Sequence, residues 1–227
     1  METKKPFDAT KYQEYEEYFS QEHSSSFQLE SGVGGVMISA PHAVEQTRNG
    51  RIKCAESQTG ALAKMLHEQL HCPIIYKTKN MGDDANYDEV CAYKKALADY
   101  VQNNKIVLLL DLHQLSPTRS IQVDVGTGSM KNVFRQEYVD EVLRAFIRNG
   151  ITDVGVDRIF NAKHPNTVSA YVARHCGIDC LQIELHSDLV RFGYPGSNVE
   201  GVYKALEEIV LSVREHIGEN YEEGNKV

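Results

Sequence analysis

Two kinds of segment are missing from this 227-residue chain: a long apolar run and a cluster of basic residues. No segment approaches the roughly 18 apolar residues of a membrane-spanning helix, and residues 1–23 lack the apolar core of a signal peptide. The net charge is −8 and the isoelectric point is about 5.6. We therefore expect neither nucleic acid nor a membrane as a partner. An oligomer is compatible with the sequence, which carries no signal for the number of subunits.

Cysteine is sparse and irregularly spaced. The chain has five cysteines, and the nearest two, Cys176 and Cys180, have no second pair at zinc-ribbon spacing. This pattern predicts reduced structural thiols in a cytoplasmic protein. Hydrophobic residues make up 41% of the chain and charged residues 25%, so we expect a sizeable buried core.

Apolar runs and amphipathic segments alternate along the chain, which indicates an α/β protein. The expected strands are 33–40, 73–76, 105–113, 120–125, 156–161 and 180–185, and the expected helices lie near 8–22, 55–71, 87–102, 131–149, 166–176 and 197–217. Residues 105–113 are apolar on both faces, which is typical of a central parallel strand. Residues 120–125 alternate and predict an edge or antiparallel strand. We predict one three-layer domain over residues 1–227, with helices on both faces of a mostly parallel (mixed) sheet and a frayed tail near 219–227.

Polar residues occur at the ends of three of these strands. Ligands of open α/β sheets bind at the carboxyl ends of the strands. His42 and Glu45 follow the first strand, three residues apart in a turn, and His113 ends the central strand. A catalytic zinc needs about three nitrogen or oxygen ligands and one open position. We predict that His42, Glu45 and His113 hold one Zn²⁺ per chain, although another divalent metal would suit the same ligands.

Glu184 is a carboxylate inside the otherwise apolar segment Leu181–Leu185. Burial there is costly unless the side chain faces a metal or a polar cleft. A carboxylate in that place can take a proton from a metal-activated water and pass it on. We therefore predict Glu184 as a general base. Asp111, two residues before His113, either orients a ligand histidine or bonds backbone amides.

Four short motifs between about residues 33 and 190 resemble those of the N-formylglutamate amidohydrolase-like family, within the wider zinc carboxypeptidase and aspartoacylase grouping. They are Ser39-Ala40-Pro41-His42, Asp83-x-x-Asn86, Leu110-Asp111-Leu112-His113 and Leu181-Gln182-Ile183-Glu184-Leu185. The resemblance implies a phosphorylase/hydrolase-like fold with one zinc. It also implies hydrolysis of an amide bond in an N-acyl amino acid or small peptide-like substrate with a free carboxylate. The chain departs from the family pattern at Ala43-Val44-Glu45, where small residues are expected.

Three assignments have open alternatives. Glu56 is a rival to Glu45 as the carboxylate ligand, or else a first-turn helix carboxylate stabilised by the helix dipole. Arg119 either binds a substrate carboxylate or stabilises an oxyanion, or it is a solvated loop residue. Asn86 either binds a substrate carboxylate or caps a helix.

His67-Glu68-Gln69-Leu70-His71 matches the His-Glu-x-x-His pattern of metalloproteases. A helical wheel places His67 and His71 on the polar face, away from the stripe formed by leucines 62, 66 and 70. This placement argues against a zinc site in the motif. Two alternatives to the zinc amidohydrolase stay open: a metalloprotease that uses this motif, and a catalytically silent α/β binding protein.

Overall fold

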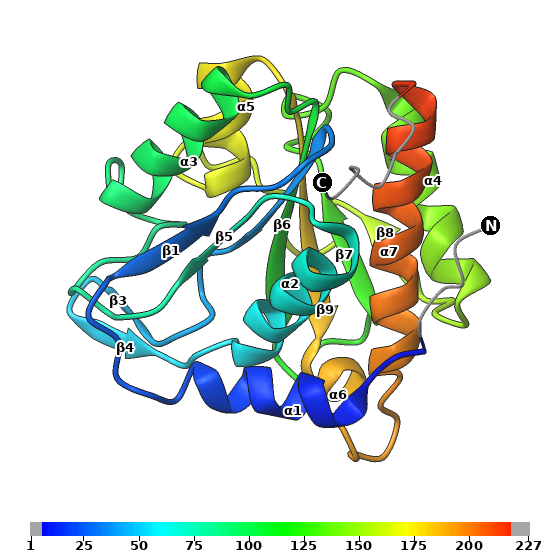
Figure 1. The fold of residues 1–227 in the computed structure, drawn as a ribbon, viewed down its shortest axis with the longest axis horizontal. Coiled ribbons are helices and arrows are strands. Elements are labelled where there is room, and N and C mark those ends of the chain that lie inside the picture. Colours follow the sequence, from blue (N-terminus) through cyan, green and yellow to red (C-terminus); the bar gives the residue numbers. More distant parts are fainter. Residues whose placement is uncertain (1–5, 219–227) are drawn as a thin grey trace, which may run out of the picture.

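The structure, a computed structural model, describes residues 6–218 and is built on a seven-stranded mixed sheet (Figure 1). Its strands are β1 (Phe27–Glu30), β2 (Val36–Ala40), β5 (Ile74–Lys77), β6 (Leu108–Leu115), β7 (Val123–Gly126), β8 (Val154–Val156) and β9 (Asp179–His186). Their spatial order is β1-β5-β2-β6-β9-β7-β8. Strands β5, β2, β6 and β9 are parallel, β1 pairs antiparallel with β5, and β7 pairs antiparallel with β9.

Helices cover both faces of the sheet, which confirms the predicted three-layer α/β fold (Figure 1). One core contains residues of α1 (Ala9–Tyr18), α2 (Ser57–Leu70), α4 (Gln136–Arg148) and α7 (Val199–His216). The other core contains residues of α3 (Ala92–Asn103) and α5 (Val168–Cys176), and the short helix α6 (Ser187–Val190) follows β9. Among residues 6–218, no helix is both long enough and apolar enough to cross a membrane.

The central strands change character along their length on the α3/α5 face. Successive side chains of a strand point to opposite faces, so Leu109, Asp111 and His113 of β6 share one face. Leu109 packs in the apolar core of that face, whereas Asp111 and His113 are buried polar residues nearer the carboxyl end. Strand β9 repeats the pattern, with Cys180 followed on the same face by Gln182 and Glu184. The sheet therefore becomes polar at its carboxyl edge.

Two predicted strands differ from the structure. The predicted strand 156–161 is replaced by β8, which ends at Val156 because the carboxylate of Asp124 accepts the backbone N–H groups of residues 158–160 and turns the chain. The predicted strand 120–125 corresponds to β7, which is antiparallel but is not at the edge of the sheet, because β8 lies outside it.

Several elements were not predicted or begin elsewhere. Strands β3 (Gln46–Arg48) and β4 (Arg51–Lys53) form a separate hairpin, with positive φ at both turn residues, Asn49 and Gly50. An Asn-Gly pair with positive φ at both positions is typical of a two-residue type I′ turn. Strand β1 and helix α6 were also unexpected, and helix α3 begins at Ala92 rather than near residue 87. The tail predicted near 219–227 lies outside the described residues.

Gly60 sets the distance between α2 and the segment that follows β2. A Cβ atom added at Gly60 would lie 2.3 Å from the ring of Phe19 and 2.8 Å from Cβ of Ala43. Such distances are too short for a side chain, so this close approach requires glycine. Glu56 is the N-cap residue of α2, one turn before Gly60. The packing at Gly60 therefore holds Glu56 close to the residues after β2.

We predict that Gly60→Val destabilises the protein by about 1–3 kcal/mol, because the added methyl groups overpack a filled interface. Urea unfolding monitored by circular dichroism measures this change. Gln69→Val is the control, since it adds a β-branched residue to the same helix outside the interface. Helix propensity alone would stabilise Gly60→Val, because valine is a better helix former than glycine, and would slightly destabilise Gln69→Val. A Gly60→Val protein as stable as the wild type would therefore contradict the packing account.

Candidate metal centre

Side chains from three segments converge at the carboxyl edge of the sheet. His42 follows β2, Glu56 caps α2, and His113 lies in β6, and their ligand atoms all fall within 4.8 Å of one another. His42 Nδ1 is 3.1 Å from Glu56 Oε1 and 3.3 Å from His113 Nδ1, and His113 Nδ1 is 3.6 Å from Glu56 Oε2. Tetrahedral zinc with ligands at 2.0–2.2 Å keeps those ligands about 3.3–3.6 Å apart. The group therefore has the dimensions of a zinc site.

A buried aspartate holds the far nitrogen of each imidazole. His42 Nε2 is 2.9 Å from Asp84 Oδ1, and His113 Nε2 is 3.1 Å from Asp111 Oδ2. An imidazole that donates Nε2–H to a carboxylate presents the Nδ1 lone pair to a metal, and such carboxylate–histidine pairs are usual behind metal ligands. The two Nδ1 atoms face each other, an arrangement in which two lone pairs repel unless a cation or a proton lies between them.

The carboxylates of the group stay ionised. Burial alone would raise the pKa of Glu56, but the neighbouring His42 and His113 outweigh it and lower the pKa to about 2. Burial would also raise the pKa of Asp84, but the hydrogen bonds and charges of His42 and Arg48 outweigh it and lower that pKa. Fixed negative charge around two imidazoles favours a bound cation.

The structure brings Glu56 to the group and leaves Glu45 outside it. Because side chains alternate along the chain entering β3, Gln46 is buried and donates its amide to backbone carbonyls, while Glu45 is exposed. The hairpin then returns the chain, so that the backbone N–H of Glu56 donates to the carbonyl of His42 at 2.8 Å. Glu56 Oε2 also accepts the backbone N–H of Gln114 at 3.0 Å. Glu56, the alternative to Glu45 as the carboxylate ligand, is therefore the residue that the fold places beside both histidines.

Glu184 lies next to the group, in register with His113 on the neighbouring strand. Its side chain is buried, lines the same cavity as the three possible ligands, and accepts a hydrogen bond from Gln182 Nε2 at 2.8 Å. Burial raises the pKa of Glu184 to about 7; His113 opposes this shift and the charge of Glu56 adds to it. The carboxyl group can therefore hold or release a proton near neutral pH.

Arg119 and Asn86, the two residues predicted to bind substrate, both line this cavity of about 450 Å³. Arg119 is exposed at its rim, with the guanidinium 5.5 Å from the centre of the Phe160 ring. Asn86 Oδ1 accepts the backbone N–H of Val168 at 2.7 Å, and Asn86 Nδ2 donates to Gln182 Oε1 at 3.4 Å. Asn86 does not cap α3, which begins at Ala92.

The His-Glu-x-x-His motif does not form one face of a helix. Helix α2 ends at Leu70, and His71 is its left-handed C-cap residue, with φ of 51°. His67 Nδ1 is 2.8 Å from the carbonyl oxygen of Cys72, and His67 Nε2 is 3.4 Å from Glu30. Both nitrogens of His67 are therefore occupied by protein groups, and among residues 6–218 the group with metal-ligand geometry is His42, Glu56 and His113.

The sequence analysis did not single out Arg48 or Asp84, which both line the cavity, and gave no role to Gln182. Arg48 Nε donates to Asp84 Oδ2 at 2.8 Å, so the hairpin supports the carboxylate behind His42. The Asn49-Gly50 pair was the available signal, because Asn-Gly is a strong sign of a hairpin. That hairpin would have shown that the chain turns back between His42 and Glu56.

The fold is similar to those of several solved structures. N-formylglutamate amidohydrolase from Ralstonia eutropha JMP134 matches with a TM-score of 0.59 and 14% identity, over 84% of this chain and 99% of that chain. A bacteriophage poly-gamma-glutamate hydrolase matches with a TM-score of 0.54 and 15% identity, over 88% and 94%. A metallo-carboxypeptidase from Burkholderia cenocepacia matches with a TM-score of 0.51 and 13% identity, over 93% and 70%.

No family model and no curated protein sequence matches the chain. At these low identities the likeness shows a shared fold. The similar structures include both kinds of protein to which the sequence motifs pointed, an N-formylglutamate amidohydrolase and a metallo-carboxypeptidase. The fold implied by that resemblance is therefore confirmed.

We predict that Glu56→Ala weakens zinc binding by more than the roughly 10- to 100-fold that loss of an outer partner costs, because it removes one of the three side chains that could hold the metal. Competition titration with a chromophoric chelator measures the affinity. Glu45→Ala is the matched control and keeps the wild-type affinity. The reverse result, in which Glu45→Ala lowers the zinc affinity and Glu56→Ala leaves it unchanged, would favour Glu45 as the ligand.

Proposed function

We propose that this protein is a zinc-dependent hydrolase of amide bonds, with His42, Glu56 and His113 as the metal ligands. The triangle formed by His42 Nδ1, His113 Nδ1 and the Glu56 carboxylate is the observation that carries the proposal. The aspartate behind each histidine supports it, since the two carboxylates direct both Nδ1 lone pairs to one point. The donor set of two nitrogens and one carboxylate is one that catalytic zinc sites use.

Zinc in this place would lower the pKa of a water molecule and polarise a carbonyl group. Glu184 is the general base: its carboxylate takes the proton of the attacking water as the oxygen–carbon bond forms. It returns that proton to the leaving nitrogen as the carbon–nitrogen bond breaks. Gln182 Nε2 holds Oε1 of Glu184, and Asn86 holds Gln182, so this pair orients the base. We therefore assign Asn86 a positioning role in place of substrate binding.

The proposed substrate is an N-acyl amino acid or a small peptide-like amide with a free carboxylate. The names of the similar structures, an N-formylglutamate amidohydrolase and a poly-gamma-glutamate hydrolase, support this class. Arg119 at the rim of the cavity supports it as well, because an exposed guanidinium near the base can bind a carboxylate with two N–H groups.

We predict that the purified protein carries about one zinc per chain, since a single group of ligands is proposed. His113→Ala is expected to lose the metal. His67→Ala, which removes a histidine of the His-Glu-x-x-His motif, is expected to keep it. Metal content by inductively coupled plasma mass spectrometry after dialysis gives the answer. Zinc retained by His113→Ala, or lost from His67→Ala, contradicts the site.

We predict that Glu184→Gln keeps its zinc and loses at least 100-fold in kcat, because the amide cannot accept the proton. The assay compares N-formyl, N-acetyl and γ-glutamyl amino acids with zinc-loaded wild type and variant. Bound zinc without hydrolysis of any substrate in the wild type would favour a catalytically silent binding protein. An active Glu184→Gln enzyme would remove Glu184 as the base.

A further inference from the structure

The cavity beside Glu184 is lined by cationic side chains as well as by the carboxylates of Glu56, Asp84 and Glu184. Four cationic side chains line it, in a chain whose net charge is −8: Arg48, Lys53, Arg119 and Lys163. Arg48 and Lys53 come from the hairpin β3–β4, whereas Arg119 follows β6 and Lys163 follows β8. The positive charge is therefore gathered at this opening from separate parts of the chain.

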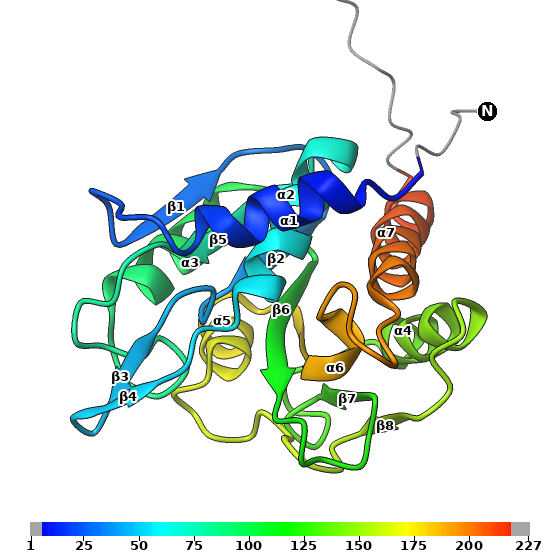
Figure 2. The same ribbon diagram turned by 90° about the horizontal axis from the view of Figure 1, so that it is seen from below.

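The two arginines lie on opposite sides of the metal group. Arg48 donates a hydrogen bond to Asp84, which follows β5, and the guanidinium of Arg119 lies over the ring of Phe160, which follows β8. In the sheet, β5 and β8 lie on opposite sides of β6, the strand that carries His113. The view from below the sheet agrees, with the hairpin β3–β4 on one side of β6 and strands β7 and β8 on the other (Figure 2).

Each guanidinium group lies over an aromatic ring that also lines the cavity. Arg48 lies 5.0 Å from the centre of the Tyr87 ring, and Arg119 lies 5.5 Å from that of Phe160. Within residues 6–218, Arg48 uses only its Nε in a hydrogen bond, and the side chain of Arg119 makes none. A guanidinium that lies over a ring keeps its planar fork of N–H donors, which suits a carboxylate. Each side of the group formed by His42, Glu56 and His113 therefore has a guanidinium with N–H donors that no residue between 6 and 218 uses.

We propose that the substrate carries a carboxylate on each side of the scissile amide bond, one bound by Arg48 and the other by Arg119. This inference rests on the proposed hydrolysis at His42, Glu56 and His113. An N-formyl amino acid has negative charge on the amine side only and would leave one arginine unused. The cavity of about 450 Å³ is within the range of small-molecule sites and has room for a substrate with two charged arms.

Four amides that differ only in charge test the inference with zinc-saturated protein. N-glutaryl-L-alanine has one carboxylate on each side of the amide, N-(4-carbamoylbutanoyl)-L-alanine on the amine side, N-glutaryl-L-alaninamide on the acyl side, and N-(4-carbamoylbutanoyl)-L-alaninamide on neither. We expect kcat/KM for the doubly charged amide to exceed that of either singly charged amide by roughly 10- to 100-fold, the usual value of a charged hydrogen bond.

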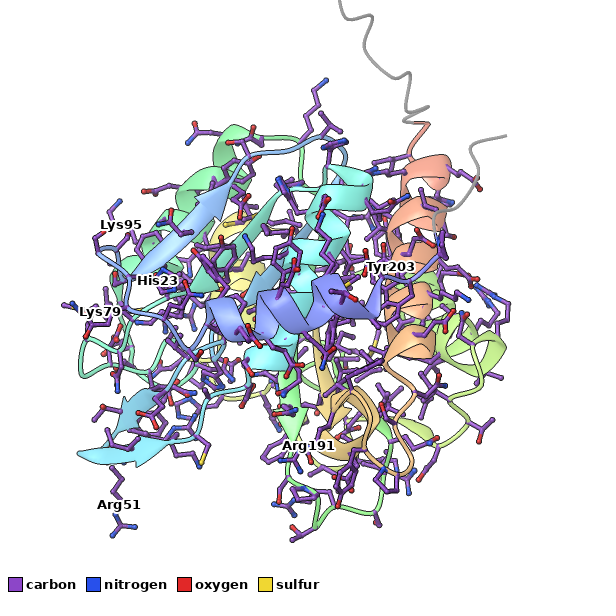
Figure 3. The ribbon with its side chains drawn as sticks, turned by 60° about the horizontal axis from the view of Figure 1, so that its bottom comes forward. His23, Arg51, Lys79, Lys95, Arg191 and Tyr203 are labelled. Carbon is purple, nitrogen blue, oxygen red and sulfur yellow. The ribbon has the colours of Figure 1, made fainter. Side chains whose placement is uncertain are left out.

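Substitution of each arginine then assigns the two sides. In each of the variants Arg48→Met and Arg119→Met, we expect kcat/KM for the doubly charged amide to fall to the value for one of the singly charged amides. One variant should match the amide charged on the acyl side, and the other variant the amide charged on the amine side. Arg51→Met is the matched control, because Arg51 pairs with Arg48 across the hairpin but is exposed and points away from the body of the molecule (Figure 3). Zinc content is measured throughout, and Arg48→Lys replaces Arg48→Met if the latter loses metal.

Binding gives a second readout that does not need turnover. Calorimetry of N-glutaryl-L-alanine with zinc-loaded Glu184→Gln is expected to show binding that weakens roughly 10- to 100-fold when either arginine is also replaced. Equal hydrolysis of the singly and doubly charged amides overturns the inference and leaves the proposed function intact. An effect of Arg51→Met as large as that of Arg48→Met also overturns it. Zinc-loaded protein that hydrolyses none of the four amides but cleaves an N-formyl, N-acetyl or γ-glutamyl amino acid overturns the inference alone, whereas protein that cleaves no amide at all overturns both proposals.

Discussion

Two imidazole nitrogens that face each other at 3.3 Å, each backed by a buried carboxylate, are the constraint on which the rest of this structure depends. Buried carboxylates are costly unless hydrogen bonds satisfy them. Asp111 accepts hydrogen bonds from Ser39 and Ser169, and Asp84 accepts them from Arg48 and from the backbone of Asn86. Strands, helix starts and a hairpin all supply these partners, so the site draws on most of the carboxyl edge of the sheet.

The order of the strands explains how distant residues meet. Strands β5, β2, β6 and β9 are neighbours and run parallel, so their carboxyl ends lie side by side. Asp84 follows β5 and His42 follows β2, while His113 and Glu184 pair in register across β6 and β9. Helix α2 adds Glu56 through its N-cap, which lies beside His42 because Gly60 allows the close approach of Phe19 and Ala43. The site is thus a consequence of parallel pairing and one tight helix contact.

The parts that the sequence predicts well are those with a local pattern. The sequence predicts where these residues lie: His42 is just after β2, His113 is near the carboxyl end of β6, and Glu184 is buried within β9. Their roles at a metal stay predictions. The order of the sheet, with helices on both faces, follows from the alternation of strand and helix patterns. The residues that support the histidines, Asp84 and Asp111, are harder to assign, because their role depends on which strand ends are adjacent.

Glu45 shows where local reasoning fails. Its spacing from His42 suggests a shared turn, but the alternation of side chains entering β3 turns Gln46 inward and Glu45 outward. Glu56 is more distant in sequence and reaches His42 only because the hairpin around Asn49-Gly50 returns the chain. The strand expected at 156–161 fails for a related reason, since three backbone bonds to Asp124 turn an apolar segment into a loop. Both errors come from contacts between segments, which spacing alone does not encode.

The position of the metal tests the central claim most directly. A crystal of the zinc-loaded protein, measured on both sides of the zinc absorption edge, locates the ion by its anomalous signal. The proposal expects one strong peak at about 2.0–2.2 Å from His42 Nδ1, His113 Nδ1 and a carboxylate oxygen of Glu56. A peak at His67 and His71, or one that contacts Glu45 in place of Glu56, would contradict it.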